Sequence, residues 1–126
     1  MAFIDYSTYL FESEQLEKNK KGKIESKYGW LEYYYEVSDE YPNGVVVDLG
    51  GYVHKEYRGQ GKLKIMLKQL LSSVPEGTTV QMAVSNRHLT PMFKRLGFKT
   101  VKRIVYWGEV SHAMENIVTK ELIDAI

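Results

Sequence analysis

Aromatic and apolar positions are first grouped in runs typical of β-strands, and apolar positions then recur with helical spacing. Residues 30–37 are rich in aromatic and β-branched side chains, which favour strands. Residues 41–44 read Tyr-Pro-Asn-Gly, a strong turn signal, and residues 45–53 form a second apolar run. We therefore expect a β-hairpin in the first half of the chain.

The following segments predict alternating helices and strands. Residues 62–71 carry leucine and methionine at helical spacing, and residues 78–84 alternate as a strand after a Pro-Glu-Gly break. Residues 90–96 predict another helix, which Gly97 would end. Residues 98–107 predict one long strand or a strand pair. This order of elements indicates an α/β fold.

The pattern is weaker at the two ends. Residues 7–19 predict a short helix that the lysine-rich run 18–23 would end, since basic side chains favour a helix C-terminus. In the tail, residues 114–126 could form a helix, or residues 116–119 a last strand. We favour a strand with a frayed end.

Composition bounds the class of protein. The 126 residues allow one domain, spanning 1–126, and 44% hydrophobic residues indicate a globular one. A net charge of +1 argues against nucleic-acid binding, and no cysteine is present to form disulfides or thiolate metal sites. We expect no metal. Neither a signal peptide nor a long apolar span is recognisable, which predicts a cytoplasmic domain away from membranes.

Residues 53–62 carry the strongest candidate for chemistry. An apolar strand there meets a short glycine-bearing loop that opens into the helix of residues 62–71. Unpaired N–H groups and the helix dipole attract phosphate, and Gly59 and Gly61 leave the main chain accessible. Arg58 and Lys62 add positive charge. The loop predicts a phosphate-bearing ligand, although an ordinary turn also explains a glycine pair.

Two motifs resemble those of the GCN5-related N-acetyltransferase (GNAT) superfamily. Glu56-x-x-Gly59-x-Gly61 is similar to its acyl-CoA loop. One helix and one strand later comes a match to its second motif, Asn86-x-x-Leu89-x-x-Met92-Phe93-x-x-Leu96-Gly97-Phe98. The resemblance covers roughly residues 45–107 and implies a GNAT-like mixed, largely antiparallel sheet flanked by helices, with a shortened N-terminal helical region.

The resemblance also implies acetyl-CoA as co-substrate. Its pantetheine arm would lie between two splayed strands near Tyr52, Val53 and His54. Asn86 would hydrogen-bond the arm, although a helix N-cap explains Asn86 nearly as well. The pyrophosphate would bind the amides of Arg58, Gly59, Gln60, Gly61 and Lys62.

The catalytic residues are less clearly marked. Aminolysis of a thioester requires the acceptor amine to lose a proton, and Asp48 is the first candidate base, with Glu32 and Glu36 as second choices. Strand alternation would place Asp48 on one face with Gly50, Tyr52 and His54. An exposed strand carboxylate is the alternative. Phe93 occupies the position where the family often has a tyrosine acid, so it would only pack against the cofactor. Either Tyr52 or Tyr34 would replace that acid, although packing also explains tyrosines in such a run, or the thiolate would leave unassisted or through water.

Three functions are compatible with these residues. The first is transfer of an acetyl group from acetyl-CoA to a primary amine of a peptide, a protein or a small molecule. The second is a catalytically silent GNAT-like domain that binds CoA or a protein partner, as Phe93 suggests. The third, a nucleic-acid modifier using the lysine run, is disfavoured by near-neutral charge. The aromatic strand and the tail are compatible with a homodimer.

Overall fold

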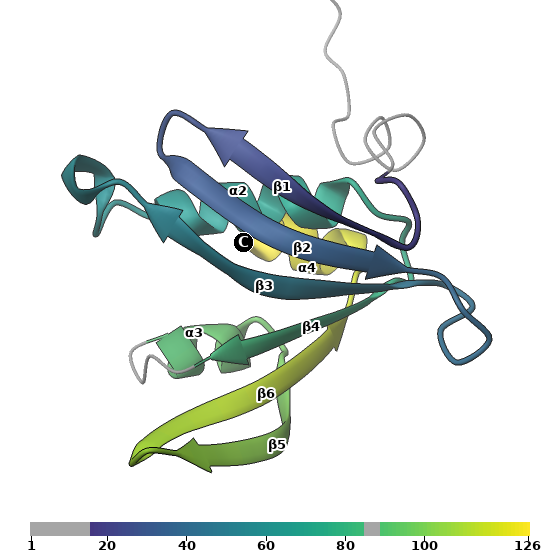
Figure 1. The fold of residues 1–126 in the computed structure, drawn as a ribbon. Coiled ribbons are helices and arrows are strands. Elements are labelled where there is room, and N and C mark those ends of the chain that lie inside the picture. Colours follow the sequence, from purple (N-terminus) through teal and green to yellow (C-terminus); the bar gives the residue numbers. More distant parts are fainter. Residues whose placement is uncertain (1–15, 85–88) are drawn as a thin grey trace, which may run out of the picture.

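The computed structural model describes residues 16–84 and 89–126, and Figure 1 shows their arrangement. Six strands form one sheet in the order β1-β2-β3-β4-β6-β5. The strands are β1 (Lys20–Ser26), β2 (Gly29–Glu36), β3 (Val45–Val53), β4 (Thr79–Val84), β5 (Lys99–Tyr106) and β6 (Glu109–Ile117). The helices are the 3-10 turn η1 (Lys55–Tyr57), α2 (Lys62–Ser72), α3 (Leu89–Arg95) and α4 (Lys120–Ala125).

The sheet is antiparallel except where β3 pairs with β4 in parallel, so it is mixed and largely antiparallel, as expected. The crossover between these two strands runs through η1 and α2. Helices α2 and α4 cover the same side of the sheet (Figure 1). None of the described helices is long and apolar enough to span a membrane.

The core lies between α2 and the sheet. The buried apolar side chains of α2 are four of those that the helical spacing predicts, and Leu63 is half-buried. They join strand side chains at alternating positions, because a strand turns every second residue inward. Buried members include Leu31, Tyr35, Val46, Met66, Leu67, Leu70, Leu71, Val80 and Met114.

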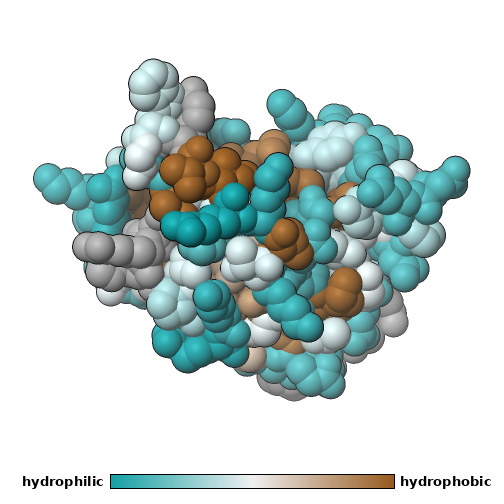
Figure 2. All heavy atoms as spheres, turned by 90° about the horizontal axis from the view of Figure 1, so that it is seen from below, coloured by the Kyte–Doolittle hydropathy of each residue, from teal (hydrophilic) through white to brown (hydrophobic). Residues whose placement is uncertain are grey.

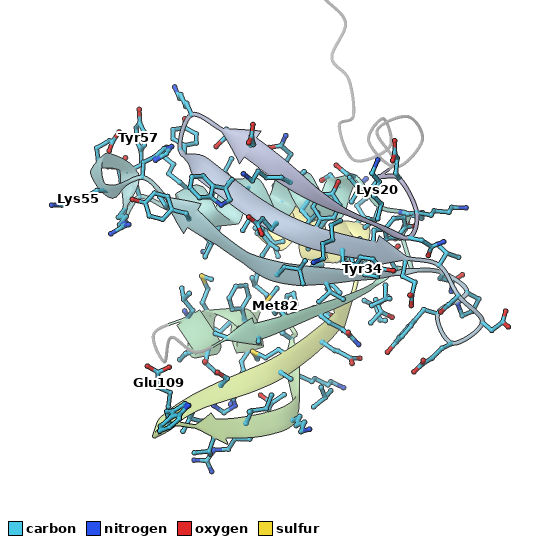
Figure 3. The ribbon with its side chains drawn as sticks, viewed as in Figure 1. Lys20, Tyr34, Lys55, Tyr57, Met82 and Glu109 are labelled. Atoms are coloured by element: carbon cyan, nitrogen blue, oxygen red, sulfur yellow. The ribbon has the colours of Figure 1, made fainter. Side chains whose placement is uncertain are left out.

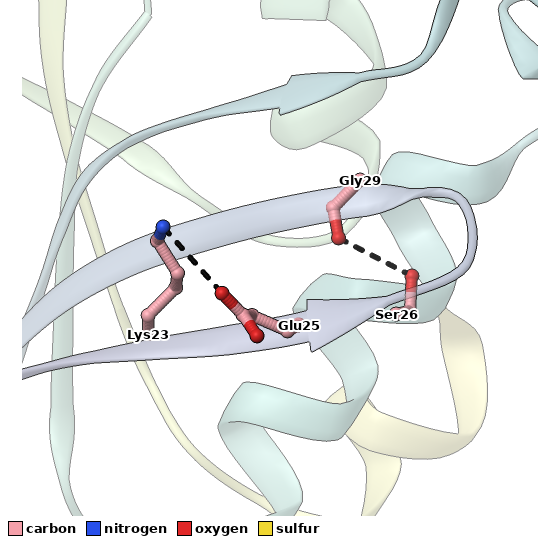
Figure 4. A network of polar contacts seen from close by, with 4 residues as sticks. All are labelled: Lys23, Glu25, Ser26 and Gly29. Carbon is pink, nitrogen blue, oxygen red and sulfur yellow. Dashed lines mark hydrogen bonds and ion pairs between the residues drawn. The ribbon is translucent and has the colours of Figure 1, made fainter.

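The N-terminal part of the described chain departs from the prediction. Residues 7–15 of the expected helix lie outside the described residues, while residues 16–19 are not helical. The lysine run begins β1, an edge strand in which Ile24 is the buried residue. Figure 4 shows two contacts at its hairpin with β2: Ser26 Oγ lies 3.5 Å from the Gly29 carbonyl, and Lys23 pairs with Glu25 at 3.5 Å.

The tail combines the two alternatives drawn from its sequence. Strand β6 begins earlier than expected and ends at Ile117, because it is held on both sides by β4 and β5. Helix α4 then begins after Thr119, whose Oγ1 accepts a hydrogen bond from the Leu122 amide at 3.1 Å. One strand, β5, occupies most of residues 98–107 and forms the far edge of the sheet.

Edge strand β5 and its surroundings carry exposed apolar side chains. Figure 2 views the molecule from below Figure 1 and shows apolar patches separated by hydrophilic side chains. Val101 and Val105 are exposed on β5, and Trp107 follows it at the hairpin turn. The homodimer stays a prediction.

Strands β3 and β4 are paired over only a short length and then diverge. Their pairing covers only residues 45–47 against residues 79–81, and the strands then diverge toward their carboxyl ends (Figure 1). Strand β3 also contains a bulge: Tyr33 pairs with Asp48 and Glu32 with Gly50, so Leu49 has no partner in β2. A bulge bends its strand. The divergence opens the sheet beside Asp48.

Candidate functional site: a cleft between diverging strands

The glycine loop joins the end of β3 to α2. Gly59 and Gly61 have φ angles of +77° and +74°, in the left-handed region that glycine adopts without strain. A Cβ built at either position would meet no atom within 4 Å. Backbone conformation therefore requires glycine here, and the space in front of the loop is open.

The N-terminus of α2 faces this open space. Gly61 is its N-cap, no side chain caps it among the described residues, and its first turn holds no acidic residue. Arg58 Nε donates to the Val53 carbonyl at 2.9 Å, and Gln60 Nε2 donates to the Glu56 carbonyl at 3.0 Å. These two bonds fix the loop from within, so its amides keep a defined arrangement.

A cavity of about 450 Å³ lies against the loop. The Lys62 ammonium is 4.2 Å from the centre of the Tyr28 ring, and the Arg58 guanidinium is 5.1 Å from that of Tyr52. Both cations therefore lie beside the loop, and the contacts named here are with aromatic rings and not with carboxylates. The residues that line this cavity are Val53, Tyr57, Arg58, Gly59, Gly61, Lys62, Leu63, Lys64, Leu89 and Met92.

A second cavity, of about 290 Å³, fills the opening between β3 and β4. It shares Val53, Leu63 and Leu89 with the loop cavity, so the two cavities adjoin, and together they are called the path from the glycine loop into the sheet. Figure 3 labels Met82 at this opening. The lining residues are Leu31, Asp48, Gly51, Tyr52, Val53, Leu63, Leu67, Met82, Ala83, Val84, Leu89 and Phe93.

Asp48 is the acidic side chain of this cleft. Its Oδ1 accepts a hydrogen bond from the Gly50 amide at 2.8 Å. Burial raises the pKa of Asp48, and the Gly50 hydrogen bond opposes that rise because it favours the charged form. A carboxylate with a raised pKa at the end of a cleft is a candidate base.

The bulge corrects the predicted faces of β3. Because Leu49 has no partner, residues beyond it face the side opposite to that expected from simple alternation: Asp48 lies on one face with Gly51 and Val53. The prediction that Asp48 shares a face with Gly50, Tyr52 and His54 was therefore wrong. The Tyr52 ring stacks on Trp30, with centroids 5.0 Å apart, and is 41% exposed.

Other predicted site residues divide into two groups. Val53, Arg58, Gly59, Gly61 and Lys62 all line the path, as does Phe93, which is buried against Phe98 with ring centroids 5.4 Å apart. Gln60 holds the loop without lining the path, and Asn86 lies outside the described residues.

Sequence reasoning missed the apolar walls of the cleft, chiefly Leu63 and Leu67 of α2 and residues 82–84 of β4. Their apolar alternation marks them only as core. These residues line the cleft because the divergence of β3 and β4 leaves an opening beside them.

Comparison of the fold with solved structures finds GNAT acetyltransferases. Arabidopsis thaliana Naa50, solved with the bisubstrate analogue CoA-Ac-MVNAL, matches with a TM-score of 0.57 and 16% identity over 70% of this chain and 64% of its own. The Escherichia coli ribosomal-protein-S18-alanine N-acetyltransferase matches with a TM-score of 0.56 and 14% identity over 86% of this chain and 74% of its own.

An aminoglycoside N(6')acetyltransferase from Legionella pneumophila matches with a TM-score of 0.56 and 18% identity, over 79% of this chain and 60% of its own. The match to Naa50 spans 64% of that protein, slightly less than two thirds of its length. No protein-family model and no curated protein matches the sequence. The chain has the GNAT fold, as its two motifs predict.

Proposed function

We propose that this protein is an N-acetyltransferase that moves an acetyl group from acetyl-CoA to a primary amine. The observation that carries the proposal is the pair of adjoining cavities that extends from the glycine loop to the opening between β3 and β4, where Asp48 is one of the lining residues. Naa50, of the same fold, was solved with an analogue that joins CoA through an acetyl group to the sequence MVNAL. That neighbour supports a peptide as one class of acceptor.

In this proposal, the main chain holds the cofactor. The amides of residues 58–62 bind the pyrophosphate at the α2 N-terminus, where unpaired N–H groups favour negative charge. The pantetheine arm follows the apolar path past Val53 and Leu63 and brings the thioester to the opening. A strand N–H there can stabilise the oxyanion of the tetrahedral intermediate.

Asp48 acts as the base. The acceptor nitrogen attacks the thioester carbon, the new C–N bond forms, the C–S bond breaks, and CoA leaves as thiolate. Asp48 takes the proton that the amine loses, which is necessary because an alkyl ammonium has a pKa of about 10.4 and no free lone pair. The burial that raises the pKa of Asp48 makes it a better proton acceptor.

No acid is assigned to the leaving group. Phe93 cannot donate a proton, and the stacking of Tyr52 on Trp30 does not favour the role of acid expected for Tyr52. A CoA thiol resembles a cysteine thiol, with a pKa of about 8.5, so its thiolate leaves readily at neutral pH. We propose unassisted departure.

Phe93→Tyr tests this last step. We expect the affinity for acetyl-CoA and the value of kcat each to change less than about threefold, because departure of the thiolate does not limit turnover. Steady-state kinetics with thiol detection gives both values. A gain in kcat of tenfold or more would show instead that acid assistance is missing from the wild-type protein.

A catalytically silent domain that binds CoA or a partner protein is the second candidate. The observation that favours it is the buried phenylalanine at position 93, which lines the cleft and carries no ionisable group. The two candidates differ in product formation.

The test of catalysis is release of CoA thiol in the presence of acetyl-CoA and a panel of amines, with the acetylated product identified by mass spectrometry. The panel holds peptides with free N-termini, a lysine peptide with a blocked N-terminus, and small amines. Amine-dependent thiol release with a matching product supports the enzyme. Binding of acetyl-CoA without any product supports the silent domain.

A further inference from the structure

The two edges of the sheet differ in their exposed side chains. Strand β1 forms one edge, and its exposed positions are all lysine or glutamate, so it gives another chain little to pack against. Strand β5 forms the other edge, where Val101, Ile104 and Val105 are exposed. An edge strand also presents a row of backbone N–H and C=O groups, and β6 is the only described strand that pairs with β5. Strand β5 therefore keeps the features to which a further strand can bind.

Positive charge is concentrated around β5. No acidic residue occurs between Glu76 and Glu109, whereas this stretch contains six basic residues. Glu109 and Glu115 are the acidic residues of the neighbouring strand β6, and Glu115 is the partner of Lys99. The cations around this edge exceed these carboxylates by five to two, since five basic residues are exposed on α3 and β5: Lys94, Arg95, Lys99, Lys102 and Arg103.

The pairing with β6 assigns the side chains of β5 to the two faces of the sheet. Met114 of β6 is buried in the core, so every second residue of β6 faces the side of α2. By their partners, Arg103 and Val105 face that side, while Lys102 and Ile104 face the other. Each face of the edge thus presents a cation followed two residues later by an apolar side chain. Two adjacent acidic residues next to two adjacent apolar ones would complement this pattern in a bound strand.

Like charge disfavours a second copy of this chain as the occupant of this edge. In an antiparallel pair of two β5 strands, the cations Lys99, Lys102 and Arg103 of one strand would lie close to those of the other, and β5 has no acidic residue. Pairing with β1 of another copy would bring these cations near the three lysines of β1. Like charges opposite each other destabilise a strand pair. The charge therefore favours a partner of the opposite sign.

Trp107 extends the apolar surface of this edge. It directly follows β5 in the turn before β6 and is 86% exposed. Trp107 and Gly108 have φ angles of +52° and +77°, a conformation that two-residue hairpin turns normally build from asparagine and glycine. An exposed tryptophan in this conformation suits an anchor for a partner, because tryptophan is enriched among the residues that dominate protein interfaces.

We propose that β5 is a docking edge for a partner protein that adds an acidic segment to the sheet as an extended strand. The segment carries two adjacent acidic residues opposite Lys102 and Arg103, and two adjacent apolar residues opposite Ile104 and Val105. Its backbone pairs with the open edge, which a nucleic acid or a membrane cannot do, and its end reaches Trp107. No residue of β5 lines the two cavities of the path, so the partner binds away from the cleft and its binding does not depend on acetyl transfer.

Binding of model peptides tests this edge. Two fluorescein-labelled peptides with blocked ends, Thr-Val-Val-Glu-Glu-Thr for antiparallel pairing and Thr-Glu-Glu-Val-Val-Thr for parallel pairing, are titrated with the full chain and followed by fluorescence anisotropy. We expect one of them to bind at least about tenfold more tightly than the same peptide with proline in place of one valine, because proline interrupts strand pairing and leaves the charge unchanged. Equal affinities, or no binding of either peptide, would overturn the proposal.

A charge exchange isolates the two central cations. The double variant Lys102→Glu with Arg103→Glu should bind the acidic peptide at least about tenfold more weakly, and it should gain affinity for a peptide with Lys-Lys in place of Glu-Glu. Lys18→Glu with Lys21→Glu makes the same change of net charge at the β1 edge and should alter neither affinity. Thermal unfolding verifies that both variants are folded. Equal effects of the two double variants would reduce the attraction to overall charge and exclude the docking edge.

Other occupants of this edge are distinguished by parallel measurements. Analytical ultracentrifugation that finds a wild-type dimer, and a monomer for Lys102→Glu with Arg103→Glu, would assign the edge to a second copy. A single-stranded oligothymidylate or phosphatidylserine vesicles that bind more tightly than the acidic peptide, and only to the wild-type edge, would assign it to a nucleic acid or to a membrane surface. Each of these results would refute the peptide partner.

Discussion

Asp48→Asn is expected to lower kcat/KM for the acceptor by about a hundredfold or more, the range over which a positioned base contributes. The affinity for acetyl-CoA should stay within about twofold, because the glycine loop lies outside the reach of this substitution. An amide oxygen can still accept the Gly50 hydrogen bond, so local geometry is kept while proton acceptance is lost.

The same substitution should stabilise the fold at neutral pH. Burial raises the pKa of Asp48 in the folded protein, so the stability from its protonated form is present below the unfolded pKa and is lost as pH rises through the raised value. A neutral amide escapes that loss. We expect a rise in Tm of about 1–3 °C at neutral pH, which disappears near about pH 3, where both states are protonated.

Asp124→Asn is the control for both measurements, since Asp124 is an exposed carboxylate on α4. It should change neither kcat/KM nor the pH dependence of Tm by a comparable amount. Wild-type rates for Asp48→Asn across the pH range would remove Asp48 as the base.

Gly61→Val is expected to weaken acetyl-CoA binding by tenfold or more. A branched side chain at this N-cap would stand where the pyrophosphate must approach the α2 amides, and the φ of +74° would strain the loop. Isothermal titration measures the affinity, and thermal unfolding measures the cost to stability, which we expect at about 1–2 kcal/mol.

Gly108→Val is the control that separates crowding of the pyrophosphate from the loss of stability caused by a side chain at a positive φ. Gly108 has a φ of +77°, and a Cβ built there would also meet nothing within 4 Å, but it lies in the turn between β5 and β6. Its replacement should cost similar stability and leave acetyl-CoA affinity unchanged. Equal affinities for the two valine variants would exclude the glycine loop as the pyrophosphate site.

Elements with a strong local pattern were predictable from sequence. The hairpin of β2 and β3, helix α2 and strand β4 are confirmed. Helix α2 and strand β4 each have an apolar face of one period, and the hairpin is marked by its turn residues between two β-prone runs. Strand β1 was missed because its alternate positions carry lysine, which protects a sheet edge and also resembles a helix end. Ile24 was its only clear inward signal.

The site was predictable in composition and less so in geometry. The glycine loop follows from local chemistry, so Gly59 and Gly61 could be recognised directly. The bulge at Leu49 reversed the expected faces of β3, although Gly50 and Gly51 in a strand are a recognised sign of one.

The most direct test of the central claim is isothermal titration of the purified protein with acetyl-CoA, in parallel with CoA and ATP. The account predicts micromolar binding of acetyl-CoA and CoA and no binding of ATP, because the pantetheine arm, which ATP lacks, occupies the path between the glycine loop and Asp48. Absence of acetyl-CoA and CoA binding would contradict it and leave the likeness to acetyltransferases as one of fold alone.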